Sequence, residues 1–236
     1  RGHLLSAGFG IILIGVAVFS ILSAYIVPVF GHVGLYVPVI AIIYIFGVRA
    51  VYYYEKTELA RFVKEGERER ELRYPGLTLK KALYMYALNA FLIVVAATFL
   101  PFIADDIASA TGLGHTFVGS ILVATTTSLP ELVVSIAAVR IGAQDLAIAN
   151  MLGSNMFNIL VLAVDDILYT EGAIVARISQ THAVTGVIAI IMTGVVVAAL
   201  TYPPKKKVVG VVCWYSALLL LLWFVSFLSL LAASGQ

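Results

Sequence analysis

One acidic side chain, Glu131, lies deep inside an apolar stretch of this sequence, and small oxygen-bearing residues surround it. In the segment ATTTSLPEL, Thr127 and Ser128 precede Glu131 by four and three residues, so they share its face on a helix. Pro130 cannot donate a backbone hydrogen bond, which leaves carbonyl groups from Ala124 onward available. Carboxylate, hydroxyl and carbonyl oxygens are the ligands of hard cations such as Ca²⁺. The segment therefore predicts a site for Na⁺ or Ca²⁺.

A second polar cluster, GSNMFN, follows in the next apolar stretch, with Ser154 and Asn158 four residues apart on one helical face. Glu131 and Ser154 each lie about eight residues, or roughly 12 Å, from the short turn that joins the two stretches. Antiparallel neighbours would bring the two clusters to the same depth. The alternatives are a protonated Glu131 that is only hydrogen-bonded in the core, and asparagines (Asn155 and Asn158) that join helices.

Long apolar stretches must position these residues. Of the 236 residues, 61% are hydrophobic and 12% are charged, against about 25% charged in soluble domains. Runs of about 20 apolar residues match the length of a helix that crosses a bilayer, and nothing alternates as membrane β-strands do. The sequence predicts an all-α polytopic membrane protein with seven spans: 4–27, 33–54, 82–104, 115–139, 146–164, 182–202 and 208–233.

Basic residues indicate how these spans are oriented, because loops rich in Lys and Arg stay in the cytoplasm. If the charged segment 55–81 is cytoplasmic, alternating spans put fourteen of the fifteen basic residues on that side and only Arg177 outside. The first residue and the 55–81 linker are then cytoplasmic, and the C-terminus is outside. We expect 55–81 to be a solvated, partly helical linker, or else a regulatory or headgroup-binding segment. A prokaryotic plasma membrane is the expected location.

The other ionisable residues are expected at helix ends or in loops. Asp165 and Asp166 either attract cations to the outer mouth or form a solvated helix end. All four histidines lie near span ends and are expected at the membrane interface: His3, His32, His115 and His182. Because no serine has a histidine at matching depth and no second buried aspartate accompanies Glu131, the sequence favours neither an intramembrane hydrolase nor any other enzyme. No cofactor is expected, and the single cysteine excludes an internal disulfide.

The first two and last two spans share a layout. His3 and His182 each precede a glycine by 12 residues, Gly15 and Gly194. The offset indicates an inverted repeat of five helices, as many transporters have. Residues 1–54 would be the last two helices of one repeat, and 82–236 a complete second repeat.

The stretch TSLPELVVSIAAVRIGAQDLAIANMLGSNMFNIL, residues 127–160, resembles the second α-repeat of the calcium/cation antiporter superfamily, which includes the sodium/calcium exchangers. The resemblance implies a ten-helix inverted-repeat fold. It also implies that Glu131 is the central cation ligand. The other ligands that it implies are the hydroxyl groups of Thr127, Ser128 and Ser154, the carbonyl of Ala124 and the side chain of Asn158.

The resemblance implies a secondary antiporter that exchanges Ca²⁺ for Na⁺ by alternating access. Two departures leave alternatives. Asn158 stands where some relatives have aspartate, which favours fewer sodium ions or protons, as in a Ca²⁺/H⁺ exchanger. The first α-repeat lies outside these 236 residues, so its helices would come from the same or another chain; otherwise the protein is a transport-inactive structural module. The expected partners are inorganic cations, the lipid bilayer and that missing repeat, with no nucleic acid.

Overall fold

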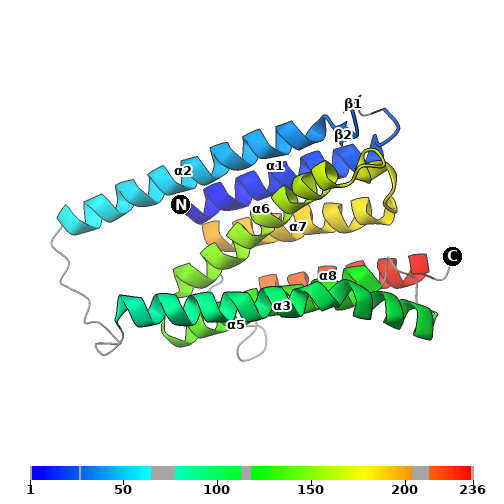
Figure 1. Ribbon diagram of the computed structural model, residues 1–236. Helices are drawn as coiled ribbons and strands as arrows, with labels where there is room; N and C mark the ends of the chain where they lie inside the picture. The colour runs from blue at the N-terminus through cyan, green and yellow to red at the C-terminus, as the bar shows by residue number, and fades with distance from the viewer. Residues whose placement is uncertain (1, 27, 65–77, 113–117, 204–212, 235–236) are drawn as a thin grey trace.

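The computed structural model describes residues 2–26, 28–64, 78–112, 118–203 and 213–234. Within these ranges the chain forms seven long helices, two short helical turns and one small hairpin (Figure 1). The long helices are α1 (Gly2–Leu22), α2 (Tyr36–Lys64), α3 (Leu79–Thr111), α5 (Ala124–Arg140), α6 (Gln144–Leu168), α7 (Thr181–Thr201) and α8 (Trp214–Ser234). The hairpin pairs β1 (Val29–Phe30) with β2 (Val33–Gly34), and the turns are the π-helix η1 (Gly119–Val123) and the 3₁₀ helix η2 (Ile174–Ala176).

The seven predicted spans are confirmed as seven helices that are long and apolar enough to cross a membrane. α3 is longer than predicted, since its 33 residues continue seven positions beyond the predicted end at 104. The hydroxyl of Thr78 accepts a hydrogen bond from the backbone of Lys81 at its start, and Gly112 ends it with a φ of 71°. A helix of about 50 Å exceeds the hydrocarbon thickness and must tilt or extend into water. Of the predicted linker, residues 55–64 continue α2, and 65–77 lie outside the described residues.

The helices form a well-packed group and a sparsely covered group. α1 is the centre of the first group: it contacts α2, α6 and α7, and half of its span is buried (Figure 1). Its core includes Leu13, Ile40 and Met156 from three helices. Gly186 of α7 lies directly against the Val18 side chain, so the absence of a Cβ allows α1 and α7 to approach closely. By contrast, Ala108 is the one residue of α3 that is buried within the described chain.

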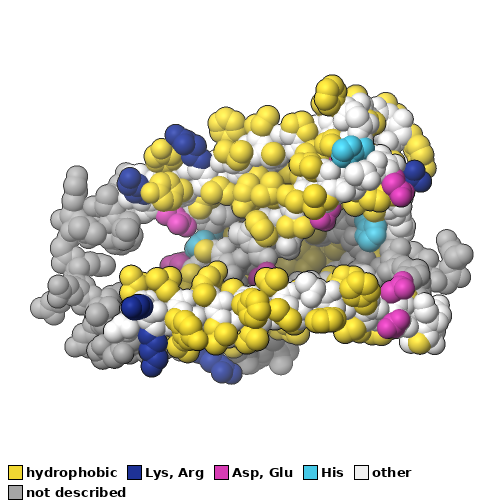
Figure 2. Space-filling model, viewed as in Figure 1, with side chains coloured by type: hydrophobic (Ala, Val, Ile, Leu, Met, Phe, Trp, Pro, Cys, Tyr) yellow, Lys and Arg dark blue, Asp and Glu magenta, His cyan; other side chains and the backbone are white. Residues whose placement is uncertain are grey.

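Side chains on the visible face match an environment of lipid with water at the two ends. Figure 2 shows hydrophobic side chains along the lengths of both helix groups, and basic side chains gathered near the end where α2 stops and α3 begins.

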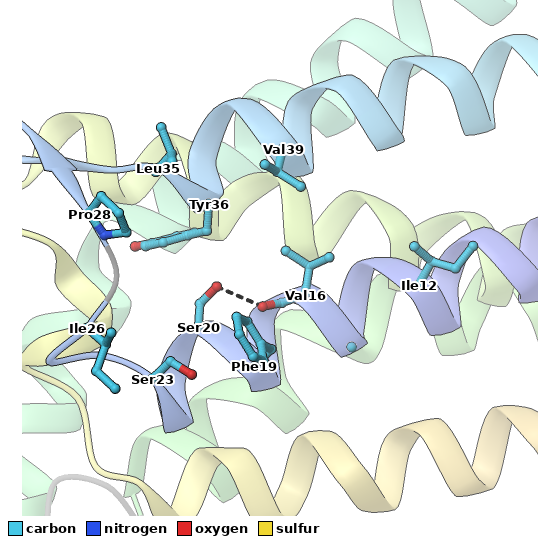
Figure 3. A pocket seen from close by; sticks show the side chains of 11 residues that line it. Ile12, Val16, Phe19, Ser20, Ser23, Ile26, Pro28, Leu35, Tyr36 and Val39 are labelled. Atoms are coloured by element: carbon cyan, nitrogen blue, oxygen red, sulfur yellow. Dashed lines mark hydrogen bonds between the residues drawn. The ribbon is translucent and has the colours of Figure 1, made fainter.

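An apolar cavity of about 660 Å³ opens between α1, α2 and the segment that joins them. Figure 3 shows Ile12, Phe19 and Val39 around it, with the Ser20 hydroxyl bonded back to the Val16 carbonyl. This cavity contains none of the predicted cation ligands.

One expectation about the far end of α6 is wrong. Asp166 is not a solvated helix end, because its exposed fraction is 0% and three hydrogen bonds reach its carboxylate. The hairpin β1–β2, the start of α2 and the turn η2 fold over this end of α6, and each supplies one of those bonds. A second buried aspartate therefore does accompany Glu131, contrary to the sequence-based expectation.

Candidate cation site

A polar pocket of about 430 Å³ lies between α5 and α6, where the two motifs were predicted to meet. Most of its wall comes from one face of each of these helices, which a three-residue connection joins as antiparallel neighbours. Its lining residues are Ile121, Ala124, Thr125, Ser128, Leu129, Glu131, Leu132, Met151, Ser154, Asn155, Asn158 and Trp223. Oxygen-bearing and amide side chains thus line a space large enough for a cation and several water molecules.

Glu131 is the central acid of this pocket, and its two carboxylate oxygens differ. Oε1 accepts a hydrogen bond of 3.1 Å from the Ser154 hydroxyl, which confirms that the two motifs lie at the same depth. Oε2 is buried, and it has no hydrogen-bond partner within the part of the chain that the structure describes. A buried carboxylate oxygen is costly to leave without a donor or a cation. One carboxylate oxygen of this pocket-lining residue is therefore left without a partner among the described residues.

The structure brings together five of the six predicted ligands. Ala124, Ser128 and Asn158 line the pocket with Glu131 and Ser154. Thr127 does not line it, because its hydroxyl donates to the backbone carbonyls of Val123 and Ala124, as threonines in membrane helices often do. The Ala124 carbonyl therefore already accepts one bond. The roles of all six residues as cation ligands remain predictions.

Two polar residues that the sequence analysis missed fix the α5–α6 pair. The side-chain amide of Asn150 donates to the Glu131 backbone carbonyl at 3.0 Å and to the Ser135 hydroxyl at 3.0 Å. Asn150 precedes Ser154 by four residues and Ser135 follows Glu131 by four, so helical spacing places each on the face of a predicted ligand. This four-residue spacing is the feature of the sequence from which Asn150 and Ser135 could have been predicted. These bonds hold the Glu131 backbone against α6.

The local shape of α5 also contributes to the pocket. The π-helical turn η1 comes directly before α5, and Pro130 lies within α5 immediately before Glu131. Both features interrupt the regular α-helical hydrogen bonding, and π-helical turns often occur at functional sites. Trp223 reaches the pocket from α8, which no feature of the sequence signalled.

The sequence pattern of the family described as sodium/calcium exchanger protein matches residues 81–233, which contain the whole pocket. The chain belongs to this family. It is an integral, multi-pass membrane protein, and the suspected relationship to the calcium/cation antiporters is confirmed.

Three curated proteins illustrate the similarity. The sodium/calcium exchanger MaX1 of Methanosarcina acetivorans is 38% identical over 92 residues, which are 38% of this chain and 26% of that protein. CaxA of Alkalimonas amylolytica, named as a candidate antiporter, is 37% identical over 103 residues, 43% of this chain and 32% of CaxA. The inner membrane protein YrbG of Escherichia coli is 45% identical over 56 residues, 24% of this chain and 17% of YrbG. Each match covers a third of the relative or less, and no solved structure matches.

Proposed function

We propose that this chain carries the cation-binding half of a secondary antiporter that exchanges Ca²⁺ for Na⁺ by alternating access. The observation that supports this most directly is the buried, unpartnered Oε2 of Glu131 within a pocket of oxygen-bearing residues. Ca²⁺ and Na⁺ both prefer oxygen ligands. Glu131 is the central ligand, and Ser128, Ser154, Asn158 and the Ala124 carbonyl complete this half of the site, with Thr127 able to join if its hydroxyl rotates.

Charge balance extends the proposal. Glu131 contributes one negative charge, and Asn158 contributes none, so this half alone cannot neutralise a Ca²⁺ ion. We infer that a second repeat, from the same or another chain, supplies a further carboxylate opposite Glu131. Two observations support this inference: α3 has one buried residue within the described chain, Ala108, and the relatives are longer than this chain. Two carboxylates balance the charge of one Ca²⁺ or of two Na⁺. An empty site would carry two uncompensated negative charges, which are costly to move through the membrane. The protein can therefore change conformation only with ions bound, so it must exchange one kind of ion for the other.

The repeat organisation belongs to the same proposal. Residues 1–54 would be the last two helices of one repeat and 82–236 the second repeat, joined by 55–81. The direct packing of α1 against α7 supports it, because these are the helices that share the His3 and His182 layout. The distribution of basic residues supports a prokaryotic plasma membrane protein with residue 1 and the 55–81 linker in the cytoplasm and the C-terminus outside.

Transport in liposomes tests the proposal. The chain is reconstituted with Na⁺ inside, and ⁴⁵Ca²⁺ uptake is measured with and without a Na⁺ gradient. We expect Glu131→Gln to abolish uptake, because the amide keeps the size of the side chain and removes its charge. The matched control is Glu171→Gln, since Glu171 lies in the exposed α6–α7 connection. Undiminished flux in Glu131→Gln would refute the role of Glu131.

Two further outcomes of this assay distinguish the alternative functions, a Ca²⁺/H⁺ exchanger and a transport-inactive structural module. Uptake that follows a pH gradient and does not require Na⁺ would replace Na⁺ coupling with proton coupling, which the single charge of this half-site also permits. A wild-type chain that neither transports nor binds ⁴⁵Ca²⁺ would leave a structural membrane module. If the chain binds ⁴⁵Ca²⁺ but does not transport it, the proposed cation ligands stand, and transport must be measured again with the second repeat present.

A further inference from the structure

The carboxylate of Asp166, at the end of α6, is a buried acidic group that the cation site does not use. Its Oδ2 accepts a hydrogen bond of 2.8 Å from the Gly34 backbone N–H. Its Oδ1 accepts bonds of 2.5 Å from the Tyr36 hydroxyl and 2.6 Å from the Ile174 backbone N–H. Asp166 is completely buried. Every partner is a donor, so hydrogen bonds from the protein replace the hydration that both carboxylate oxygens lose on burial.

Two of these three bonds join segments that are distant in sequence, and the third comes from Ile174, eight residues after Asp166. Gly34 ends the β1–β2 hairpin, Tyr36 begins α2, and Ile174 begins the turn η2 between α6 and α7. Gly34 cannot be replaced by a residue with a side chain unless Tyr36 moves, because a Cβ there would collide with the Tyr36 ring. The side chain of Tyr36 therefore lies over Gly34 and reaches Asp166 from the wall of the apolar cavity (Figure 3). One carboxylate thus joins α6 to the α1–α2 connection, to the start of α2 and to the turn η2 that precedes α7.

α6 is then held at two points along its length. Near its middle, Ser154 bonds Glu131 of α5. Asp166 follows Asn158 by eight residues, or about 12 Å along the helix. A slide of α6 by one turn, about 5.4 Å, would break all three bonds to Asp166. Because these bonds come from different directions, they fix both the axial position and the rotation of the helix that carries Ser154 and Asn158.

We propose that Asp166 is a positioning residue for the cation site, which sets the placement of Ser154 and Asn158 relative to Glu131 by locking α6 to the α1–α2 connection. This proposal rests on the proposed role of Glu131, but it concerns a different part of α6. It makes Asp166 part of a rigid unit of α1, α2 and α6, against which the site is assembled.

The test compares Asp166→Asn with Asp165→Asn in the full chain. Asp165 is the adjacent carboxylate on the same helix, it is exposed, and it serves as the matched control. Hydrogen exchange measured by mass spectrometry reports the lock directly. We expect the segments containing Gly34 and Ile174 to exchange faster in Asp166→Asn, because the amide cannot replace both acceptor oxygens, and to be unchanged in Asp165→Asn.

Equilibrium ⁴⁵Ca²⁺ binding to the folded, monodisperse fraction reports the positioning role. We expect roughly tenfold weaker binding in Asp166→Asn, as is common when the groups that orient a metal ligand are removed. Tyr36→Phe removes one of the three bonds and should weaken binding by a smaller factor; it carries the test if Asp166→Asn does not fold. Faster exchange with unchanged affinity would overturn the positioning role, and unchanged exchange would overturn the lock.

The two proposals can fail separately. If Glu131→Gln binds Ca²⁺ as the wild type does, the proposed cation site is wrong, whereas the exchange rates near Gly34 and Ile174 still show whether Asp166 locks α6. If Glu131→Gln abolishes binding and Asp166→Asn leaves both exchange and affinity unchanged, the site stands and the lock does not.

Discussion

Glu131 is a half-buried carboxylate on α5 and Asp166 is a completely buried one on the neighbouring α6, and the hydrogen bonding of their oxygens differs in a way that separates their roles. Both oxygens of Asp166 accept hydrogen bonds from the protein itself. Only one oxygen of Glu131, a residue that lines the pocket, does so among the described residues, and the other has no partner there. A buried charge must be compensated by donors or by an opposite charge. A buried carboxylate whose oxygens all accept hydrogen bonds from the protein therefore has a structural role. A carboxylate with one oxygen left without a donor is a candidate cation ligand.

The largest expected effect tests the structural half of this comparison. Asp166→Ala leaves three buried donors without an acceptor, and at about 1 kcal/mol or more for each, unfolding should become easier by about 3 kcal/mol or more. Reversible unfolding in mixed detergent and SDS measures this change. The control, Asp165→Ala, should stay within about 0.5 kcal/mol of the wild type. Equal losses in the two variants would mean that the bonds to Asp166 contribute no special stability.

The cation half of the comparison predicts the next effect. Ca²⁺ at a hundred times its dissociation constant should stabilise the wild type by about 2.7 kcal/mol, because it binds the folded state alone. In Glu131→Gln this Ca²⁺-dependent increase should vanish, while stability in chelator stays close to that of the wild type. Thermal unfolding of the purified chain with and without Ca²⁺ measures both quantities. A Ca²⁺-dependent shift that survives in Glu131→Gln would place the ion elsewhere.

A smaller effect is expected from the polar residues that hold Glu131 in place. Asn150→Ala removes two bonds between α5 and α6, and at about 0.6 kcal/mol each inside a membrane the loss should be about 1.2 kcal/mol. Ser135→Ala removes only one of them and should cost about half as much. The same unfolding assay compares the two variants. If Ser135→Ala costs as much as Asn150→Ala, the bond to the Glu131 carbonyl does not contribute.

The smallest expected effect is on the reactivity of the Cys213 thiol, which also reports the membrane side opposite to the one where Asp166 lies. Cys213 precedes α8 at the opposite end of α7, and hydrogen bonds from the Ser216 side chain and backbone lower the pKa of its thiol. A lower pKa raises the thiolate fraction at neutral pH, so Cys213 should react readily with maleimides. Ser216→Ala should slow this reaction and move its pH dependence to higher pH. An impermeant maleimide should label Cys213 from the cytoplasmic side; labelling from outside would reverse the proposed orientation.

The seven helices and the meeting of the two motifs could be predicted because helical geometry is local. A rise of 1.5 Å per residue fixes the depth of Glu131 and Ser154, and a spacing of four residues fixes their faces. The same spacing could have identified Asn150 and Ser135. It could not show that the Thr127 hydroxyl bonds back to its own helix, because that choice depends on a single side-chain rotamer.

By itself, the sequence determined that this chain is a helical membrane protein of the exchanger family and that Glu131 lies within a span at the level of Ser154. Apolar length and helical period carry that information without reference to other segments. Only the tertiary structure decided which acids are buried and what each one contacts. The sequence places Asp166 near a helix end. It is buried in the structure because Gly34 and Tyr36, more than 100 residues earlier, and Ile174, from the turn after α6, all donate hydrogen bonds to it.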